Sequence, residues 1–502
     1  MKKRTLENIK IDTIGYGGVG IWVLDNGKKV LVKWGLPGSV VNGRVLKQKK
    51  DYVELQITDV VSVDNEFLDG EIKCPHYLFP YQETSDLPLY KQGCGWCKWQ
   101  ALSYNKQLAL KYQIVHDSLW RVIDLQDDML PAVVSSPQQF QYRNKIEFSC
   151  GTYRTRVDEE KSSFDEVVTL WFHLQGHFAQ IVDVDQCFLI APEMHKAYEH
   201  LKKDLIASWL PIYRVKQHTG FLRHLVIRQW VRTGQIMVIL SVAGDRLTDH
   251  QEDQQCRENL IKKRKQTPEL QKLITTCIVT NNNWWADVVQ NQDMNIQTVW
   301  WTGYIFEELH IQEQVLRFQI SPFSFFQTNT FGAELLFQKA FDMIGPIQWT
   351  VLDLYCGSGT IGICALKSGI GDTLVGVEIV EEAIQDAQKN AIINWLGEQA
   401  HFFAWKAEQV VKNEKKLVSL LEELGLIIVD PPRQGLHKEV IVFLNTLRAK
   451  YSCKLLYISC NPVTFARDVQ LLQSTGKRNL HSLQPVDMFP QTYHIELIGL
   501  LE

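Results

Sequence analysis

The chain has 502 residues, more than one ordinary hydrophobic core accommodates, so two or three domains are expected. Hydrophobic residues make up 45% and charged residues 22% of it, as in folded globular proteins. It contains no apolar run of about 18 residues, which excludes a predicted membrane span. The basic start MKKRTLENIKID lacks the apolar region of a secretory signal, so a cytoplasmic location is expected.

The first 65 residues are predicted to form a small β-barrel of the oligonucleotide-binding kind. Short apolar runs alternate with glycine turns and predict about five strands, with Asp25-Asn26-Gly27 as a hairpin turn. Residues 1–50 hold 11 Lys and Arg against 3 Asp and Glu, a balance of +8, so the net charge of −4 leaves −12 for the other 452 residues. A basic module on an acidic body favours RNA as a partner, although a solvated basic surface also explains these charges.

Residues 66–320 are predicted to form a mixed α/β domain that begins with a group of cysteines. The chain has eleven cysteines and no export signal, so a disulfide framework is not expected. Four of them, with 19 and then 2 residues between the first three, suit an iron–sulfur cluster or a structural zinc: Cys74, Cys94, Cys97 and Cys187. A helix is predicted from about Gln100 to Asp124, and a helix over 100–130 is expected to pack on the C-terminal domain.

From about residue 321 the pattern becomes strand–helix–strand, typical of a doubly wound α/β sheet. Residues 350–366, TVLDLYCGSGTIGICAL, read as a strand, a glycine-rich turn that approaches a ligand, and a helix. The next strand, LVGVEIV, places Glu378 at its carboxyl end, where a carboxylate accepts both ribose hydroxyls of a nucleoside. Because the glycines also match the spacing of dinucleotide-binding turns, this motif alone leaves NAD open.

The strand LGLIIV ends in Asp430-Pro431-Pro432-Arg433, at the sheet edge where ligands bind in such folds. This segment resembles the fourth motif of class I methyltransferases. In their amino-methylating branch an aromatic residue follows the prolines, whereas Arg433 follows here, which argues against amino-group methylation. The alternative interpretation is a proline-rich turn after a buried strand.

Cys460 follows the strand LLYIS and precedes Asn461-Pro462, a rigid turn that would expose its sulfur. A lone cysteine at a strand end is more often buried and inert. However, a methyltransferase that acts on C5 of uracil needs such a nucleophile, because this carbon alone is not basic enough to accept a methyl group. Glu496 in the last strand supplies the base that the same reaction needs. We therefore expect the Cys460 thiolate to add to C6 and Glu496 to remove the C5 proton. His494 is either a neighbour of this site or a core residue.

Five motifs in family order, spread over nearly the whole chain, resemble the bacterial RNA (uracil-5-)-methyltransferases. They are SPFSFFQTN (321–329), DLYCGSG (353–359), DPPRQG (430–435), SCNP (459–462) and FPQTYHIE (489–496). The resemblance implies a catalytic domain over 321–502 that takes its methyl group from S-adenosylmethionine. It implies cofactor contacts from Gln327, Tyr355, Glu378 and Asp430, with Cys460 as the nucleophile and Glu496 as the base.

Residues 1–65 also resemble the TRAM domain of the rRNA-modifying branch of this family, which implies 23S rRNA as the substrate; tRNA is the alternative. In that branch four cysteines in this order hold a 4Fe-4S cluster. Here the segment 75–93 resembles an insertion and Gly95-Trp96 replaces the usual Gly-Gly, so zinc and metal-free cysteines stay open. A monomer is expected.

Two functions of other classes compete with this one. An iron–sulfur electron-transfer or sensing protein needs neither Cys460 nor Glu496, and a non-catalytic RNA-binding protein needs no cofactor motif. Both kinds of feature occur together in this chain, which favours the enzyme.

Overall fold

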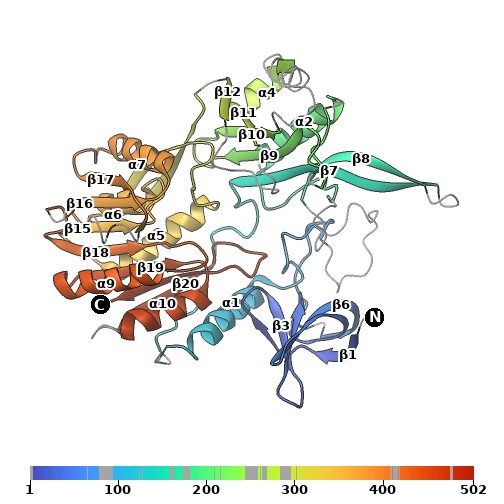
Figure 1. Ribbon diagram of the computed structural model, residues 1–502, viewed down its shortest axis with the longest axis horizontal. Coiled ribbons are helices and arrows are strands. Elements are labelled where there is room, and N and C mark those ends of the chain that lie inside the picture. The colour runs from blue at the N-terminus through green and yellow to red at the C-terminus, as the bar shows by residue number, and fades with distance from the viewer. Residues whose placement is uncertain are drawn as a thin grey trace.

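The computed structural model describes residues 4–64, 66–77, 94–123, 125–126, 128–158, 163–172, 181–208, 210–214, 216–243, 258–259, 262, 268–282, 295–300, 302–407, 410, 417, 419–474 and 479–502. Most of the expected insertion at 75–93 lies outside these residues. Three large sheets follow one another along the chain, and Figure 1 shows one helix, α1, between the N-terminal and C-terminal sheets. Across the part of the chain described here, no helix is both long and apolar enough to cross a membrane.

The N-terminal sheet has six strands, one more than the sequence suggests, in the order β1-β5-β6-β4-β3-β2. They are β1 (Thr5–Lys10), β2 (Thr13–Gly15), β3 (Val19–Val23), β4 (Lys29–Lys33), β5 (Ser39–Gln48) and β6 (Tyr52–Val63). The predicted hairpin at Asp25-Asn26-Gly27 is confirmed, since β3 pairs antiparallel with β4 and Gly27 takes the positive φ of 78° that its turn needs. Closure of this sheet into a barrel stays a prediction.

The central domain is built on a second six-stranded sheet in the order β12-β11-β10-β9-β7-β8. Its strands are β7 (Lys145–Asp158), β8 (Ser163–Trp171), β9 (Leu222–Gln229), β10 (Ile236–Val242), β11 (Thr276–Asn281) and β12 (Asn295–Trp300). Helices α2 (Pro192–Ala207) and α4 (Pro268–Leu273) belong to this domain, and their apolar side chains join one core with β9 and β10. A separate hairpin of β13 (Ile305–Ile311) and β14 (Gln314–Ile320) follows.

The C-terminal domain has a seven-stranded sheet in the order β17-β16-β15-β18-β19-β21-β20, which confirms the predicted doubly wound, or Rossmann-like, α/β class. The strands are β15 (Thr350–Leu354), β16 (Thr373–Glu378), β17 (Ala400–Ala404), β18 (Leu424–Val429), β19 (Lys454–Ser459), β20 (Leu480–Val486) and β21 (Glu496–Leu501). The first five lie parallel, and β21 runs antiparallel between β19 and β20. The parallel strands therefore end at one edge, and β21 begins there.

Helices cover both faces of this sheet, so its strands read as continuous apolar runs. Alternate side chains of β18, such as Leu426 and Ile427, enter opposite cores. The first core takes in α5 (Thr330–Ile344), α6 (Thr360–Lys367), α7 (Glu381–Ile393) and the β13–β14 hairpin, which precedes the predicted boundary at residue 321. The second takes in α9 (Lys438–Tyr451), α10 (Pro462–Ser474) and the end of α1.

Helix α1 spans Tyr104–Leu119, shorter than the predicted Gln100–Asp124. Gln100 precedes the helix in a turn closed by the Leu102 N–H, which donates to the Trp99 carbonyl. Val115 and Leu119 pack in the second core of the C-terminal domain, while Ile114 packs with Ile14 of the N-terminal sheet. The helix thus joins the two domains (Figure 1).

Candidate active site and cysteine cavity

The glycine-rich turn lies between β15 and α6, at the carboxyl edge of the sheet. Gly357 and Gly359 take positive φ angles of 54° and 77°, which favour glycine, and a Cβ at Gly359 would lie 3.1 Å from Ala387 and Phe402. Tyr355 also has a positive φ, 64°, unusual for a bulky residue and common at functional sites. The Ala387 and Phe402 side chains therefore leave little room for a side chain at Gly359, whereas at Gly357 the backbone angle alone favours glycine.

Two carboxyl groups flank this turn. Glu378 ends β16 and accepts hydrogen bonds from the N–H groups of Ile379 at 2.7 Å, Val380 at 3.0 Å and Gly357 at 3.3 Å. Asp353 accepts one from Gly362 N–H at 3.1 Å, and burial raises its pKa to about 8, aided by the charges of Asp430 and Glu378. Its Oδ1 is buried without a hydrogen-bond partner among the described residues.

Gln327 lies in the segment that leads into α5, and the central domain holds this segment. Asn144 donates to the Gln327 carbonyl at 3.0 Å, and its own N–H donates to the Thr328 carbonyl at 2.9 Å. Asn329 caps α5 by accepting from Gly332 N–H at 2.9 Å and donates to the Met488 carbonyl, also at 2.9 Å. The SPFSFFQTN motif thereby connects the central domain, α5 and Met488, the residue directly before the FPQTYHIE segment.

Cys460 and Glu496 are neighbours because of strand pairing. Ser459 of β19 lies opposite Leu497 of β21 in an antiparallel register. Cys460, one residue after this pair, and Glu496, one residue before it, are therefore brought near each other at the end of the two strands. Cys460 is half-buried, whereas Glu496 is only 5% exposed. Thus two residues 36 positions apart in sequence meet at the edge where β18 delivers Asp430.

The electrostatics of this edge favour protonated groups. Burial raises the pKa of Cys460 to about 11, and the charges of Glu496 and Asp430 act in the same direction. Burial also raises the pKa of Glu496, with Asp430 adding to the shift, and burial alone raises that of Asp430 to about 7. Arg433 opposes the shifts of Cys460 and Glu496, through its charge in both cases and through a hydrogen bond to Cys460.

Arg433 is a site residue whose charge role was not predicted from the sequence. Its carbonyl accepts from Asn461 Nδ2 at 3.0 Å and from Thr464 Oγ1 at 3.3 Å, which ties the DPPR loop to the cysteine loop. The sequence signal that could have indicated this role is the position of Arg433 directly after Pro432, in the loop at the ligand-binding edge of the sheet. His494 stays neutral, because burial and nearby cations, Arg433 first among them, lower its pKa to about 3; its ring centroid lies 4.2 Å from that of Tyr493.

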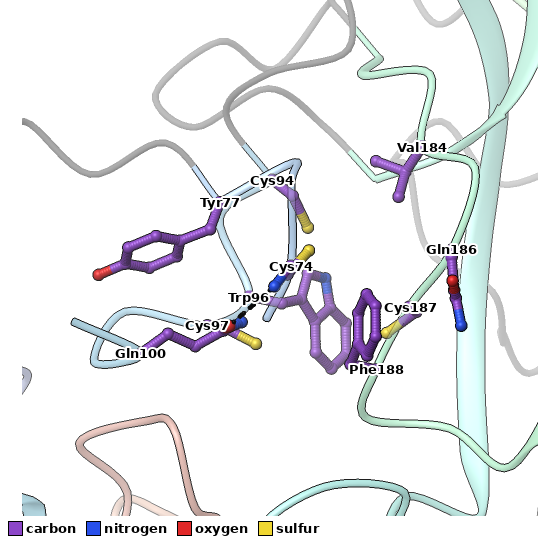
Figure 2. Close-up of a pocket in the computed structure, with 10 residues that line it drawn as sticks. All are labelled: Cys74, Tyr77, Cys94, Trp96, Cys97, Gln100, Val184, Gln186, Cys187 and Phe188. Atoms are coloured by element: carbon purple, nitrogen blue, oxygen red, sulfur yellow. Dashed lines mark hydrogen bonds between the residues drawn. The ribbon is translucent and has the colours of Figure 1, made fainter. Parts of the chain in front are cut away.

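The four candidate ligand cysteines line a single cavity. Figure 2 shows Cys74, Cys94, Cys97 and Cys187 around it, together with Trp96. Burial raises the pKa of Cys74 and Cys187 to about 12, and the charge of Cys94 adds to both shifts. None of the cysteines described in the structure forms a disulfide.

Two donors near this cavity oppose part of the effect of burial on the cysteine pKa values. Gln100 hydrogen-bonds to Cys97, and the charge of Arg143 lowers the pKa of Cys187 against the effect of burial. Arg143 also stacks over the Trp96 ring at 4.1 Å. Nevertheless, within the described parts of the chain no group of three or more His, Cys, Asp or Glu residues is arranged to hold a metal ion.

Comparison with known proteins identifies the family. The tRNA (Uracil-5-)-methyltransferase family matches residues 287–502. An uncharacterized RNA methyltransferase of Caldanaerobacter subterraneus subsp. tengcongensis is 31% identical over 503 residues, 100% of both chains. One from Clostridium tetani is 32% identical over 505 residues, 100% of this chain and 98% of the relative.

A solved structure agrees over the full length. The crystal structure of Pyrococcus abyssi tRNA (uracil-54, C5)-methyltransferase in complex with S-adenosyl-L-homocysteine is 25% identical, with a TM-score of 0.66, and the match covers 99% of this chain and 100% of that one. The resemblance predicted from the five motifs is confirmed: the chain belongs to the S-adenosylmethionine-dependent RNA (uracil-5-)-methyltransferase family and is an RNA methyltransferase.

Proposed function

We propose that this enzyme methylates C5 of a uridine in RNA through a covalent bond between Cys460 and C6 of the base. The observation that supports the proposal is the pairing of β19 with β21, whose last pair, Ser459 and Leu497, directly adjoins Cys460 and Glu496. Asp430 and Arg433 act electrostatically on both side chains. A nucleophile, a base and a cation at one sheet edge are the groups that this reaction needs.

The Cys460 thiol and the Glu496 carboxyl must first release their protons to solvent, because burial raises both pKa values. From the thiolate and the carboxylate, the reaction conserves atoms and electrons in four steps. The Cys460 thiolate forms a bond to C6, and the C5–C6 electron pair moves into an enolate. C5 then takes the methyl group from the sulfonium of S-adenosylmethionine, which leaves as S-adenosylhomocysteine. Glu496 accepts the C5 proton, the double bond re-forms and Cys460 departs as a thiolate. Arg433 favours the thiolate before attack and after release.

The glycine-rich turn and its neighbours are proposed to hold the methyl donor. Glu378 would accept hydrogen bonds from the ribose hydroxyls, and Tyr355, Gln327 and Asp430 would contact the rest of the molecule. The main-chain N–H groups on Glu378 keep its carboxylate in one orientation, which supports this assignment.

Ribosomal RNA, 23S rRNA in particular, is the substrate we propose. The N-terminal sheet, which we assign as TRAM-like, presents exposed basic side chains to RNA: Lys29, Lys33, Lys47, Lys49 and Lys50. A tRNA substrate is the second candidate, favoured by the full-length match to the P. abyssi enzyme, whose name specifies tRNA. We further propose that the enzyme acts as a cytoplasmic monomer.

Methyl transfer to each RNA tests this assignment. The purified full-length enzyme is incubated with labelled S-adenosylmethionine and unmodified 23S rRNA or tRNA, and nucleosides are analysed by mass spectrometry. We expect 5-methyluridine in 23S rRNA and little in tRNA. The reverse result would move the substrate to tRNA, and no 5-methyluridine in either would contradict uridine methylation.

We propose that Cys74, Cys94, Cys97 and Cys187 bind a 4Fe-4S cluster that ties the cysteine segment to the central domain. Their shared cavity and the nearby Gln100 and Arg143 support this, since such donors stabilise cluster sulfurs. Cluster binding would have to draw the thiolates together. Anaerobically purified enzyme should contain about four irons, and Cys97→Ala should lose them; zinc or no metal in the wild type would overturn the proposal.

A further inference from the structure

The β2–β3 hairpin of the N-terminal sheet reaches the active site. Its tip, Gly15-Tyr16-Gly17-Gly18, is closed by a hydrogen bond from Gly18 N–H to the Gly15 carbonyl at 3.1 Å. Gly18 packs so closely on the catalytic-domain residue Tyr493 that a Cβ there would lie 2.9 Å from the Tyr493 ring. This contact places Tyr16 against a segment that ends at Glu496.

Three side chains from three parts of the chain meet at Tyr493, in the segment that leads to Glu496. The rings of Tyr16 and Tyr493 meet edge to face, with centroids 6.3 Å apart and an interplanar angle of 85°. Lys98, from the cysteine segment, lies with its Nζ 4.8 Å from the centre of the Tyr493 ring. Tyr493 lies three residues before Glu496 in the chain. Burial raises the pKa of Tyr16 to about 12, and the charges of Cys460, Arg433 and Glu496 make smaller contributions to this shift.

The corner is held in place by packing. Tyr16 and Tyr493 join a cluster that also contains Ile14 and Ile114 of α1. The N–H groups of Lys98 and Trp99 donate to the Gln491 carbonyl, at 2.9 and 3.2 Å. The three side chains nevertheless stay partly exposed, so a ligand can contact them.

We propose that Tyr16, Lys98 and Tyr493 form a subsite for the RNA nucleotide next to the target uridine, so that the N-terminal sheet completes the active site. This inference rests on the proposed uridine methylation. A nucleotide base can stack on the face of one tyrosine ring and contact the edge of the other, since the two rings meet at a right angle. Lys98 beside them can pair with the phosphate of the same nucleotide. The target uridine must leave its stack to meet Cys460, and a neighbouring base held in this corner would keep it exposed.

A double-mutant cycle that combines protein variants with altered RNAs tests the subsite. The substrate is an RNA oligonucleotide that contains the uridine methylated by the wild type. It is used unaltered, or with an abasic site at the nucleotide on the 5′ or the 3′ side of that uridine. The proteins are the wild type, Tyr16→Phe, Tyr16→Ala and Trp395→Ala, which serves as a control for loss of an aromatic side chain. Trp395 is 88% exposed. It follows α7, a helix that starts at the carboxyl edge of the sheet and runs away from the active site. The readouts are kcat and KM for methyl transfer, with the melting temperature of each variant.

Tyr16→Ala should raise KM at least about fivefold with little change in kcat, whereas Tyr16→Phe, which keeps the ring, and Trp395→Ala should match the wild type. For the wild type, an abasic site on one side of the target uridine should raise KM by a similar factor. For Tyr16→Ala, the same abasic site should raise KM no further, because the contact that it removes is already lost. Equal abasic losses in both proteins, or wild-type kinetics for Tyr16→Ala, would overturn the subsite but not uridine methylation. A wild type that makes no 5-methyluridine in RNA would overturn both.

Discussion

The Nζ of Lys111 lies 2.5 Å from the Oδ1 of Asp487, and both side chains are fully buried. The pair joins α1 to the segment that leads into the active site. Lys111 also donates to the Phe489 carbonyl at 3.0 Å, and Asp487 accepts from the Tyr104 hydroxyl at 3.0 Å. The position of residues 487–496 therefore depends on a helix far earlier in the chain, since Lys111 and Asp487 are 376 positions apart.

Replacing Lys111 by methionine should lower the free energy of unfolding by about 3–5 kcal/mol, because it leaves the Asp487 carboxylate buried without a cation. Denaturant unfolding measures the loss. Lys106→Met on the same helix is the control, since its pair with Asp69 is partly exposed and water screens it. The double variant Lys111→Met/Asp487→Asn should recover part of the loss. Equal stability of the two single lysine variants would contradict this account.

The reactivity of Cys460 should follow its raised pKa. Only the thiolate reacts with iodoacetamide, so the rate at Cys460 should rise about tenfold per pH unit and level off only near its pKa of about 11. Arg433→Gln removes the cation that favours the thiolate, so the pKa should rise further and the rate at pH 8 should fall. Peptide mass spectrometry follows the modification of Cys460 alone. Arg121→Gln, at an exposed position, should react like the wild type; an unchanged rate in Arg433→Gln would show that this charge has no such role.

Glu496→Gln should stop the reaction after methyl transfer, because the amide cannot take the C5 proton and Cys460 cannot leave. With ordinary RNA this variant should accumulate a methylated protein–RNA adduct, visible as a slow band in denaturing electrophoresis. Glu502→Gln, at the partly exposed end of the same strand pair, should turn over normally. Full turnover by Glu496→Gln would assign the base to another residue.

Glu378→Gln should weaken binding of S-adenosylhomocysteine about tenfold or more, since a charged acceptor for the ribose hydroxyls is lost. Calorimetry gives the dissociation constant directly. Glu381→Gln changes a nearby exposed carboxylate in the first turn of α7 and should bind as the wild type does. If both variants bind equally well, Glu378 does not hold the ribose.

The Rossmann-like domain and the convergence of its motifs could be predicted because both depend on local patterns. Apolar runs that alternate with helices predict parallel strands, and parallel strands bring their carboxyl ends to one edge. Glu378 ends one such strand, and Asp430 and Cys460 follow two others, so their common edge is expected from chain order. Glu496 joins them only because β21 runs antiparallel, an arrangement that becomes certain with the pairing of Ser459 and Leu497.

Contacts between distant segments were beyond prediction. Nothing in the local pattern of Lys111 or Tyr16 indicates that Asp487 or Tyr493 lies beside it, because neither pair has a fixed spacing in sequence. The predicted helix from Gln100 was too long, since its first residues form a turn whose polar groups bind other segments. The parallel pairing of β4 with β6 likewise arises from tertiary structure.

Trapping with 5-fluorouridine RNA tests the covalent mechanism most directly. Fluorine at C5 cannot leave as a proton does, so the enzyme, incubated with this RNA and S-adenosylmethionine, should remain attached to a methylated base. We predict a slow band in denaturing electrophoresis that is absent for Cys460→Ala and present for Cys453→Ala, a buried cysteine on the same strand segment. A wild type that methylates ordinary RNA but forms no band, or a band that persists in Cys460→Ala, would contradict Cys460 as the nucleophile.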